Sequence, residues 1–214
     1  MKKVFLLCLA ASFILHASAQ NEKFIAAMKT NIGAMDTAFK NPASFLTLTN
    51  NFERIGNAEK TQWLPYYYAA LCQVNYAFIM GDMSKLDAIA DRAEMYLNKA
   101  DSLMPKNSEI SCIRSLIATE RMIVNPMQRY GEYGPKIKLN LEAAKIEDAN
   151  NPRPYYIEGE NLKNTPENFG GGCAAAATFL KTAKEKFLSF KPASDISPNW
   201  GEKRTDELIK ECNL

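Results

Sequence analysis

Three glycines immediately before a predicted helix are the first residues in this chain that could bind a ligand. Gly170, Gly171 and Gly172 precede a helical pattern that begins at Cys173. Free backbone N–H groups at a helix start can hold a carboxylate or a phosphate. No lysine followed by serine or threonine comes after them, so they do not form a P-loop. A purely structural alternative stays open, because glycine permits the positive φ of a tight turn.

A second group of candidates combines aromatic rings with a cation. Arg129, Tyr130 and Tyr133 lie close together in the chain, and Tyr155 and Tyr156 follow later. Tyrosine and arginine are common anchors at binding surfaces. The alternative is that the first tyrosines fold back over a core, and that Tyr155 and Tyr156 belong to that core. The sequence leaves both open.

The scarcity of histidine excludes several kinds of site. The only histidine is His16, which lies in a segment that we expect to be removed. Ser-His-Asp and Cys-His catalysis would then be impossible, as would histidine-based zinc, copper or iron sites. We therefore predict a protein that is not an enzyme and that has no catalytic residues, no metal site and no cofactor.

The start of the chain reads as a signal peptide. Lys2 and Lys3 precede an apolar run from Val4 to Leu15, which is too short to span a bilayer as a helix. Small residues at Ala17 and Ala19 follow, as at a signal-peptidase cleavage site. We expect residues 1–19 to be a signal peptide cleaved after Ala19, and the mature protein to be exported to the periplasm or secreted.

The charge balance argues against two kinds of partner. Removing Lys2 and Lys3 lowers the basic count from 26 to 24, which equals the 24 acidic residues. A formally neutral chain lacks the net basic character of nucleic-acid-binding proteins. No later apolar run approaches the roughly 20 residues of a membrane helix. We predict no nucleic-acid partner and no membrane span.

Four cysteines follow the signal peptide, at positions 72, 112, 173 and 212. None forms a CxxC motif, and an oxidising compartment would allow disulfides between them. Cys173 and Cys212 flank the last predicted helical hairpin, which makes them the expected pair. Cys72 and Cys112 fit better as small buried apolar residues.

The elements that must position these residues are helices. Apolar side chains recur every three or four residues along most of the chain, and no strand-like alternation occurs. We predict an all-α fold of about nine helices in a single domain, residues 20–214. The expected hairpins are residues 21–57, 61–103, 108–148 and 152–190, and the expected capping helix is residues 202–212.

Two segments rich in glycine and proline interrupt this pattern. They are residues 125–135 and residues 164–172, and both are expected to be non-helical. Each lies inside a predicted hairpin, between its two helices. We therefore expect both insertions at one edge of the molecule.

Small and apolar residues recur in a way that resembles the tetratricopeptide repeat family. The three sets that carry this resemblance are Ala93, Leu97, Ala100 and Pro105; Leu141, Ala144 and Ala149; and Ala176, Leu180 and Ala183. The spacing between the sets exceeds the repeat length of about 34 residues, by an amount that matches the two insertions. The resemblance implies a right-handed solenoid of antiparallel helical hairpins.

Nearly the whole chain is also similar to short exported tetratricopeptide-like proteins of Bacteroidota. The segments that carry this similarity are residues 151–156, 165–172 and 198–201. The family consists mainly of scaffolds for proteins or peptides. It implies a non-enzymatic exported scaffold that binds an unknown protein or peptide in its concave groove. The alternative is a periplasmic carrier of a small anionic ligand, or a transport accessory protein, with Arg129 or the glycines holding the ligand.

Overall fold

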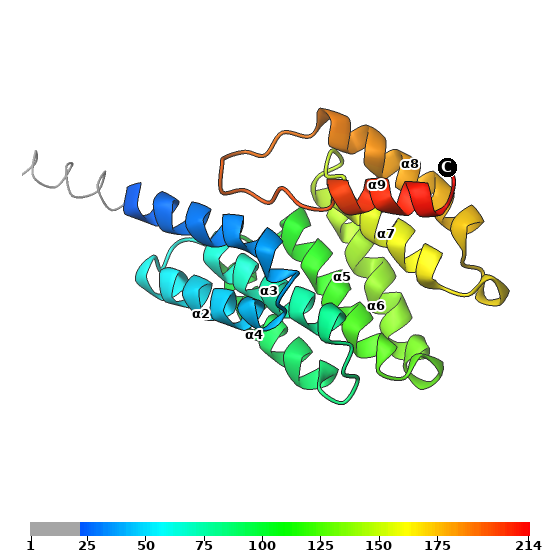
Figure 1. Cartoon of the computed structure of the whole chain (residues 1–214), viewed down its shortest axis with the longest axis horizontal. Coiled ribbons are helices and arrows are strands. Elements are labelled where there is room, and N and C mark those ends of the chain that lie inside the picture. Colours follow the sequence, from blue (N-terminus) through cyan, green and yellow to red (C-terminus); the bar gives the residue numbers. More distant parts are fainter. Residues whose placement is uncertain (1–21) are drawn as a thin grey trace, which may run out of the picture.

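The computed structural model describes residues 22–214, and every regular element in that range is helical (Figure 1). The predicted signal peptide, residues 1–19, lies outside the described residues. The all-α prediction is confirmed for the described part. A first helix covers residues 22–38. The others are α2 (Ala43–Ala58), α3 (Leu64–Met80), α4 (Leu86–Leu103), α5 (Ser108–Ile123), α6 (Pro126–Glu147), α7 (Arg153–Asn164), the short 3₁₀ helix η1 (Glu167–Phe169), α8 (Cys173–Ser189) and α9 (Glu202–Glu211).

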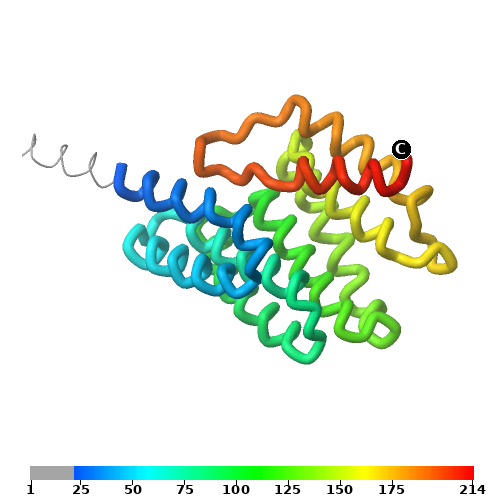
Figure 2. Tube along the Cα trace, in the orientation of Figure 1, coloured from blue at the N-terminus to red at the C-terminus, as the bar shows by residue number. Residues whose placement is uncertain are grey.

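Helices that follow one another in the chain pack against one another (Figure 2). The most enclosed is α3, in which Tyr67, Ala69, Ala70 and Cys72 are completely buried. Such a helix is apolar around its whole circumference because it is packed on all sides. None of the helices in residues 22–214 is long and apolar enough to cross a membrane.

The four turns that close successive helix pairs lie along one edge of the molecule. They follow the first helix, α3, α5 and α7. In Figure 1 the turns after α3, α5 and α7 run along the lower right side, and the turn after the first helix lies nearer the middle of the view. Consecutive antiparallel helices place alternate turns at the same end. We call this side the turn edge.

Residues 125–135 are helical, and the prediction of a loop there was wrong. Helix α6 begins at Pro126, where a missing N–H costs nothing, and the Asn125 side chain accepts a hydrogen bond from the N–H of Gln128. Pro135 stands inside the helix. The stretch stays helical because both ends are fixed, by this cap and by the packed residues from Ile137 onwards. We call residues 126–135 the α6 arm.

The segment between α8 and α9 is a long loop that extends back toward the first half of the chain. Residues 190–201 contain no helix or strand, and they form the long orange loop in Figure 2. Tyr68 donates a hydrogen bond from Oη to the carbonyl oxygen of Ile196 at 3.0 Å. Trp200 donates from Nε1 to the Oη of Tyr67 at 2.7 Å. These two hydrogen bonds attach the C-terminal segment to α3, although the two segments are far apart in the sequence.

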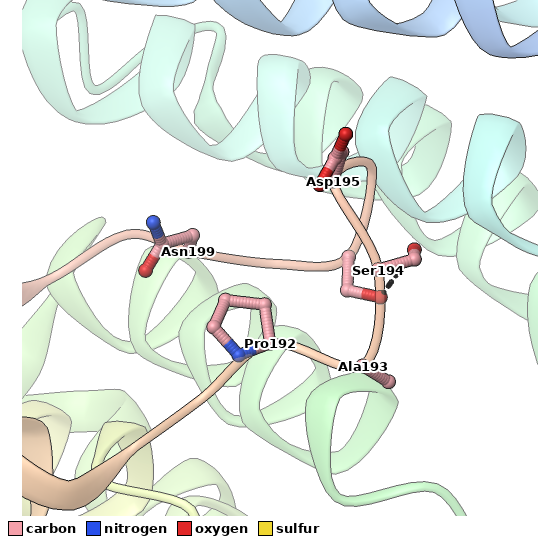
Figure 3. Close-up of a pocket in the computed structure, with 6 residues that line it drawn as sticks. Pro192, Ala193, Ser194, Asp195 and Asn199 are labelled. Carbon is pink, nitrogen blue, oxygen red and sulfur yellow. Dashed lines mark hydrogen bonds between the residues drawn. The ribbon is translucent and has the colours of Figure 1, made fainter.

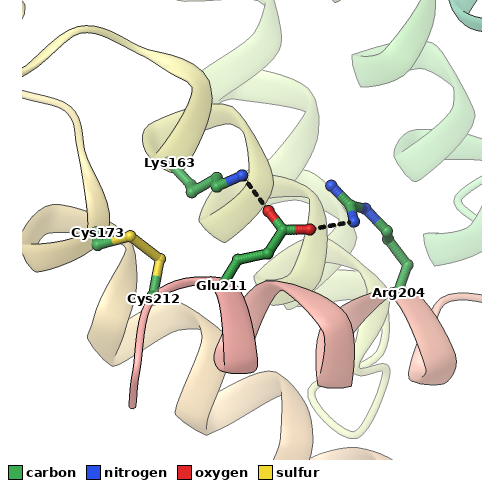
Figure 4. Close-up of a disulfide and its surroundings, with 5 residues drawn as sticks. All are labelled: Lys163, Cys173, Arg204, Glu211 and Cys212. Carbon is green, nitrogen blue, oxygen red and sulfur yellow. Dashed lines mark hydrogen bonds and ion pairs between the residues drawn. A yellow bond between two sulfur atoms is a disulfide. The ribbon is translucent and has the colours of Figure 1, made fainter.

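A disulfide and an ion-pair cluster hold α9 in place (Figure 4). Cys173 at the start of α8 is bonded to Cys212 just after α9, with the two Cα atoms 5.3 Å apart. Glu211 accepts hydrogen bonds from Lys163 of α7 and from Arg204. Cys72 and Cys112 are free and buried, as expected for small core residues.

Candidate functional site

A buried polar network lies at the start of α7. Asn151 accepts a hydrogen bond from the backbone N–H of Arg153 at 2.9 Å, which fixes the first turn. The Arg153 side chain is fully buried and donates to Glu109 Oε1 at 2.8 Å and to the carbonyl oxygen of Pro198 at 2.6 Å. Its guanidinium carbon lies 5.3 Å from the ring centre of Trp200. Because every side of this arginine is enclosed, the network joins α5, α7 and the C-terminal segment and has no open face for a ligand.

A second buried ionisable side chain, unlike Arg153, has no hydrogen-bond partner in the described part of the chain. Glu120 of α5 is completely buried, and neither of its carboxylate oxygens has a hydrogen-bond partner among the described residues. Burial raises the pKa of the Glu120 carboxyl well above its ordinary value, and the nearby charge of Arg121 opposes this only in part. The neutral acid is therefore the form that the fold accommodates.

The raised pKa of Glu120 predicts a loss of stability at alkaline pH. The folded state holds this proton at pH values where the unfolded chain has released it, so the free energy of unfolding falls as pH rises above about 4.5. Glu120→Gln cannot ionise and should be more stable than the wild type at pH 8 by about 1–2 kcal/mol, but not at pH 4. Urea denaturation at both pH values measures this. Glu94→Gln is the control, because it removes an exposed partner of Arg121. If this control raises the free energy of unfolding at pH 8 as much as Glu120→Gln does, the explanation is refuted.

A hollow of about 390 Å³ lies within the C-terminal segment (Figure 3). Its lining residues all come from that segment, namely Pro192, Ala193, Ser194, Asp195, Ser197 and Asn199. The lining is mainly polar, and Asp195 is paired with Lys29 of the first helix. An apolar ligand would find little surface there.

The three glycines form a tight turn on the turn edge. Gly170 and Gly172 have φ values of +82° and +89°, which favour glycine. The N–H groups of Gly170, Gly171 and Gly172 donate to the carbonyl oxygens of Glu167, Pro166 and Leu162. A Cβ at Gly171 would lie 2.0 Å from the carbonyl oxygen of Thr165. In this conformation the three N–H groups are used within the turn and do not face a ligand.

The other candidates lie at two opposite ends of the molecule. Tyr156 is buried and donates to Glu160 at 2.6 Å. Tyr155 lies beneath Lys145, which is near the end of α6, at 5.3 Å from ring centre to Nζ. By contrast, Tyr130 and Tyr133 belong to the α6 arm. The structure therefore brings the arm tyrosines and the glycine turn to the same edge, and it places Tyr155 and Tyr156 away from them.

Arg129 is held by an ion pair that crosses between helix pairs. Its Nη1 and Nη2 donate to the two carboxylate oxygens of Asp87 at 2.7 and 2.8 Å. Asp87 lies in the first turn of α4, and Nη1 also donates to the carbonyl oxygen of Arg121. This hydrogen bonding lowers the pKa of Asp87. Arg129 thus fixes the α6 arm against the neighbouring turn.

Exposed apolar side chains occur at or beside each of the turns along the turn edge. At least one such side chain belongs to each of the four turns or to a helix end next to that turn. The residues are Phe39, Phe78, Met83, Met127, Tyr130 and Phe169. Met127 is 80% exposed and Tyr130 is 67% exposed. A contiguous apolar patch commonly marks a binding site, whereas single exposed apolar side chains are ordinary on protein surfaces. Of this set, only Tyr130 was identified from the sequence, since the apolar type of a residue does not show whether it is exposed or packed against another segment.

Residues 22–214 form an all-α fold, and no group of metal-ligating side chains occurs among them. Among solved structures, the chain is similar to the HusA haemophore from Porphyromonas gingivalis, with a TM-score of 0.79 and 33% sequence identity. The alignment covers 88% of this chain and 92% of that one. The chain therefore belongs to the family of the HusA haemophore. No protein-family model and no curated protein sequence matches it, so the resemblance to tetratricopeptide repeats stays a prediction.

Proposed function

We propose that this protein is an exported carrier of haem or a related porphyrin, which binds on the turn edge. Two findings support the proposal: membership in the family of a haemophore, and the exposed aromatic and thioether side chains along that edge. The position of these exposed side chains is the reason that we propose the turn edge as the binding site. Both findings favour the small-ligand alternative from the sequence over a scaffold for a protein or peptide, and a carrier over an enzyme.

The ring system of the ligand would supply most of the binding energy. A porphyrin presents two broad apolar faces, and aromatic and methionine side chains pack well against such faces. No histidine occurs in residues 22–214, and Cys72 and Cys112 are buried. Imidazole and these thiolates are therefore not available as iron ligands at this edge. Met127 and Tyr130 are residue types that can ligate haem iron, but we propose that contact with the ring dominates the binding. We expect haem and an iron-free porphyrin to bind comparably.

A titration with matched variants tests this site. Met127→Ala and Tyr130→Ala, combined in one protein, should weaken binding of haem on the order of tenfold, because each change removes apolar contact area. Leu139→Ala and Ile146→Ala serve as the control pair, since these residues are similarly exposed on α6 but lie beyond the arm. Quenching of tryptophan fluorescence by haem and by protoporphyrin measures both affinities. Equal affinities for the two double variants would refute the site.

Export and the repeat architecture belong to the same proposal. The predicted signal peptide and the relation to a haemophore support export, and purification from the native envelope or medium should give a chain that begins at Gln20. Recovery of the protein with residues 1–19 intact from the cytoplasm would contradict this. The order in which the helices pack supports a solenoid of hairpins, and we retain the tetratricopeptide-like arrangement as the proposed architecture.

A further inference from the structure

The α6 arm has few contacts that hold it to the rest of the molecule. None of residues 126–136 is buried, whereas Ile137, Leu141 and Ala144 anchor the remainder of α6 in the core. Tyr133 is half-buried against that core. The other connections that fix the arm come from Arg129, which pairs with Asp87 and donates to the carbonyl oxygen of Arg121.

The sequence of the arm also weakens its helix. Gly131 and Gly134 both stand inside α6, and glycine lowers helix stability relative to alanine. Pro135 has no N–H and cannot donate to the carbonyl oxygen of Gly131. The weakest point of α6 therefore lies at Gly134 and Pro135, one turn or less before the first buried residue, Ile137.

We propose that the α6 arm is a hinged segment that opens and closes at the turn edge. Gly134 and Pro135 form one hinge, the turn at Asn125 that joins the arm to α5 forms the other, and the Arg129–Asp87 pair is the latch. Met127 and Tyr130 move with the arm, so its closure sets their positions for the ligand. The effect on a porphyrin rests on the proposed function, whereas the opening itself does not.

Hydrogen exchange of the ligand-free protein tests the hinges and the latch. Amides of residues 128–134 should exchange faster than those of residues 138–147. Asp87→Asn should accelerate exchange in the arm about three- to tenfold, since it removes a bidentate charged hydrogen bond. Gly131→Ala should slow it about fivefold, because a Cβ there meets no atom within 4 Å and alanine favours the helix.

Two control variants match these changes elsewhere. Asp101→Asn removes an inter-helix pair with Arg114 at 2.8 Å, whose exposure is close to that of the latch. Gly33→Ala fills equally open space in the helix of residues 22–38. Neither should change exchange in the arm. Uniform protection along α6 in the wild type, or the same arm exchange in Asp87→Asn and Asp101→Asn, would overturn the proposal.

A second set of measurements adds haem to the wild type. Closure on the ligand should slow exchange in residues 128–134 and leave that of residues 22–38 unchanged. If haem binds and arm exchange stays the same, the arm is not coupled to the ligand, and this part is refuted. If haem does not bind at all, the proposed function fails, while the ligand-free results still decide whether the arm is hinged.

Discussion

Replacing Arg153 by methionine should lower the free energy of unfolding by about 3–5 kcal/mol, one of the two largest effects that we expect. The change leaves Glu109 in the core without its cation. Burial already raises the pKa of Glu109, and Arg153 is the main group that opposes this rise. The variant also loses the hydrogen bond to Pro198, so the C-terminal segment should loosen. Urea denaturation followed by circular dichroism measures the loss.

A double variant separates the unpaired charge from the lost packing. Arg153→Met combined with Glu109→Gln should be more stable than Arg153→Met alone, because no buried carboxylate is left without a cation to balance its charge. Arg114→Met is the control, since it removes an arginine from a half-exposed pair with Asp101 and should cost about 0–1 kcal/mol. A similar loss in Arg153→Met and Arg114→Met would show that the network contributes little.

Removal of the disulfide should cause the second of the two largest losses in the free energy of unfolding. Cys173→Ser combined with Cys212→Ser should lower the free energy of unfolding by about 4 kcal/mol, because the bond closes a long loop in the unfolded chain. The two cysteines are 39 residues apart. Urea denaturation of the oxidised wild type and of the double variant, without reductant, measures the difference.

Reduction of the wild type provides the matching control. With the bond reduced, the wild type and the double serine variant should unfold at the same urea concentration. Glu211 and its partners Lys163 and Arg204 would still hold α9, so we expect the variant to fold. Equal stability of the oxidised wild type and the variant would contradict a stabilising role of the bond.

The sequence predicted the elements better than it predicted the arm. Apolar spacing located the helices because it reports a local property, the face that each helix buries. Glycine and proline between residues 125 and 135 indicated a loop, yet the stretch is helical. Glycine costs about 1 kcal/mol and proline about 3 kcal/mol inside a helix. The cap at Asn125 offsets part of this cost, and the packing of Tyr133 and of the residues from Ile137 onwards, which the local sequence does not show, supplies more.

The candidate site could be predicted only in part. Tyr130 and Arg129 were identified because an aromatic ring and a cation stood close together in the chain. Phe39, Met83 and Phe169 join them only because three other turns end at the same edge. The spacing of apolar residues within one helix contains no information about which distant turn will lie beside it.

By itself, the sequence determined the helical class, the absence of histidine after residue 16 and the presence of cysteines that can pair. These follow from residue type and from spacing along one helix. The tertiary structure decided that Arg153 is enclosed, that the three glycines use their N–H groups within their own turn, and that Tyr130 is exposed while Tyr156 is buried. Burial depends on contacts between segments far apart in the chain, and for that reason only the packed molecule shows which chemical groups are free to bind.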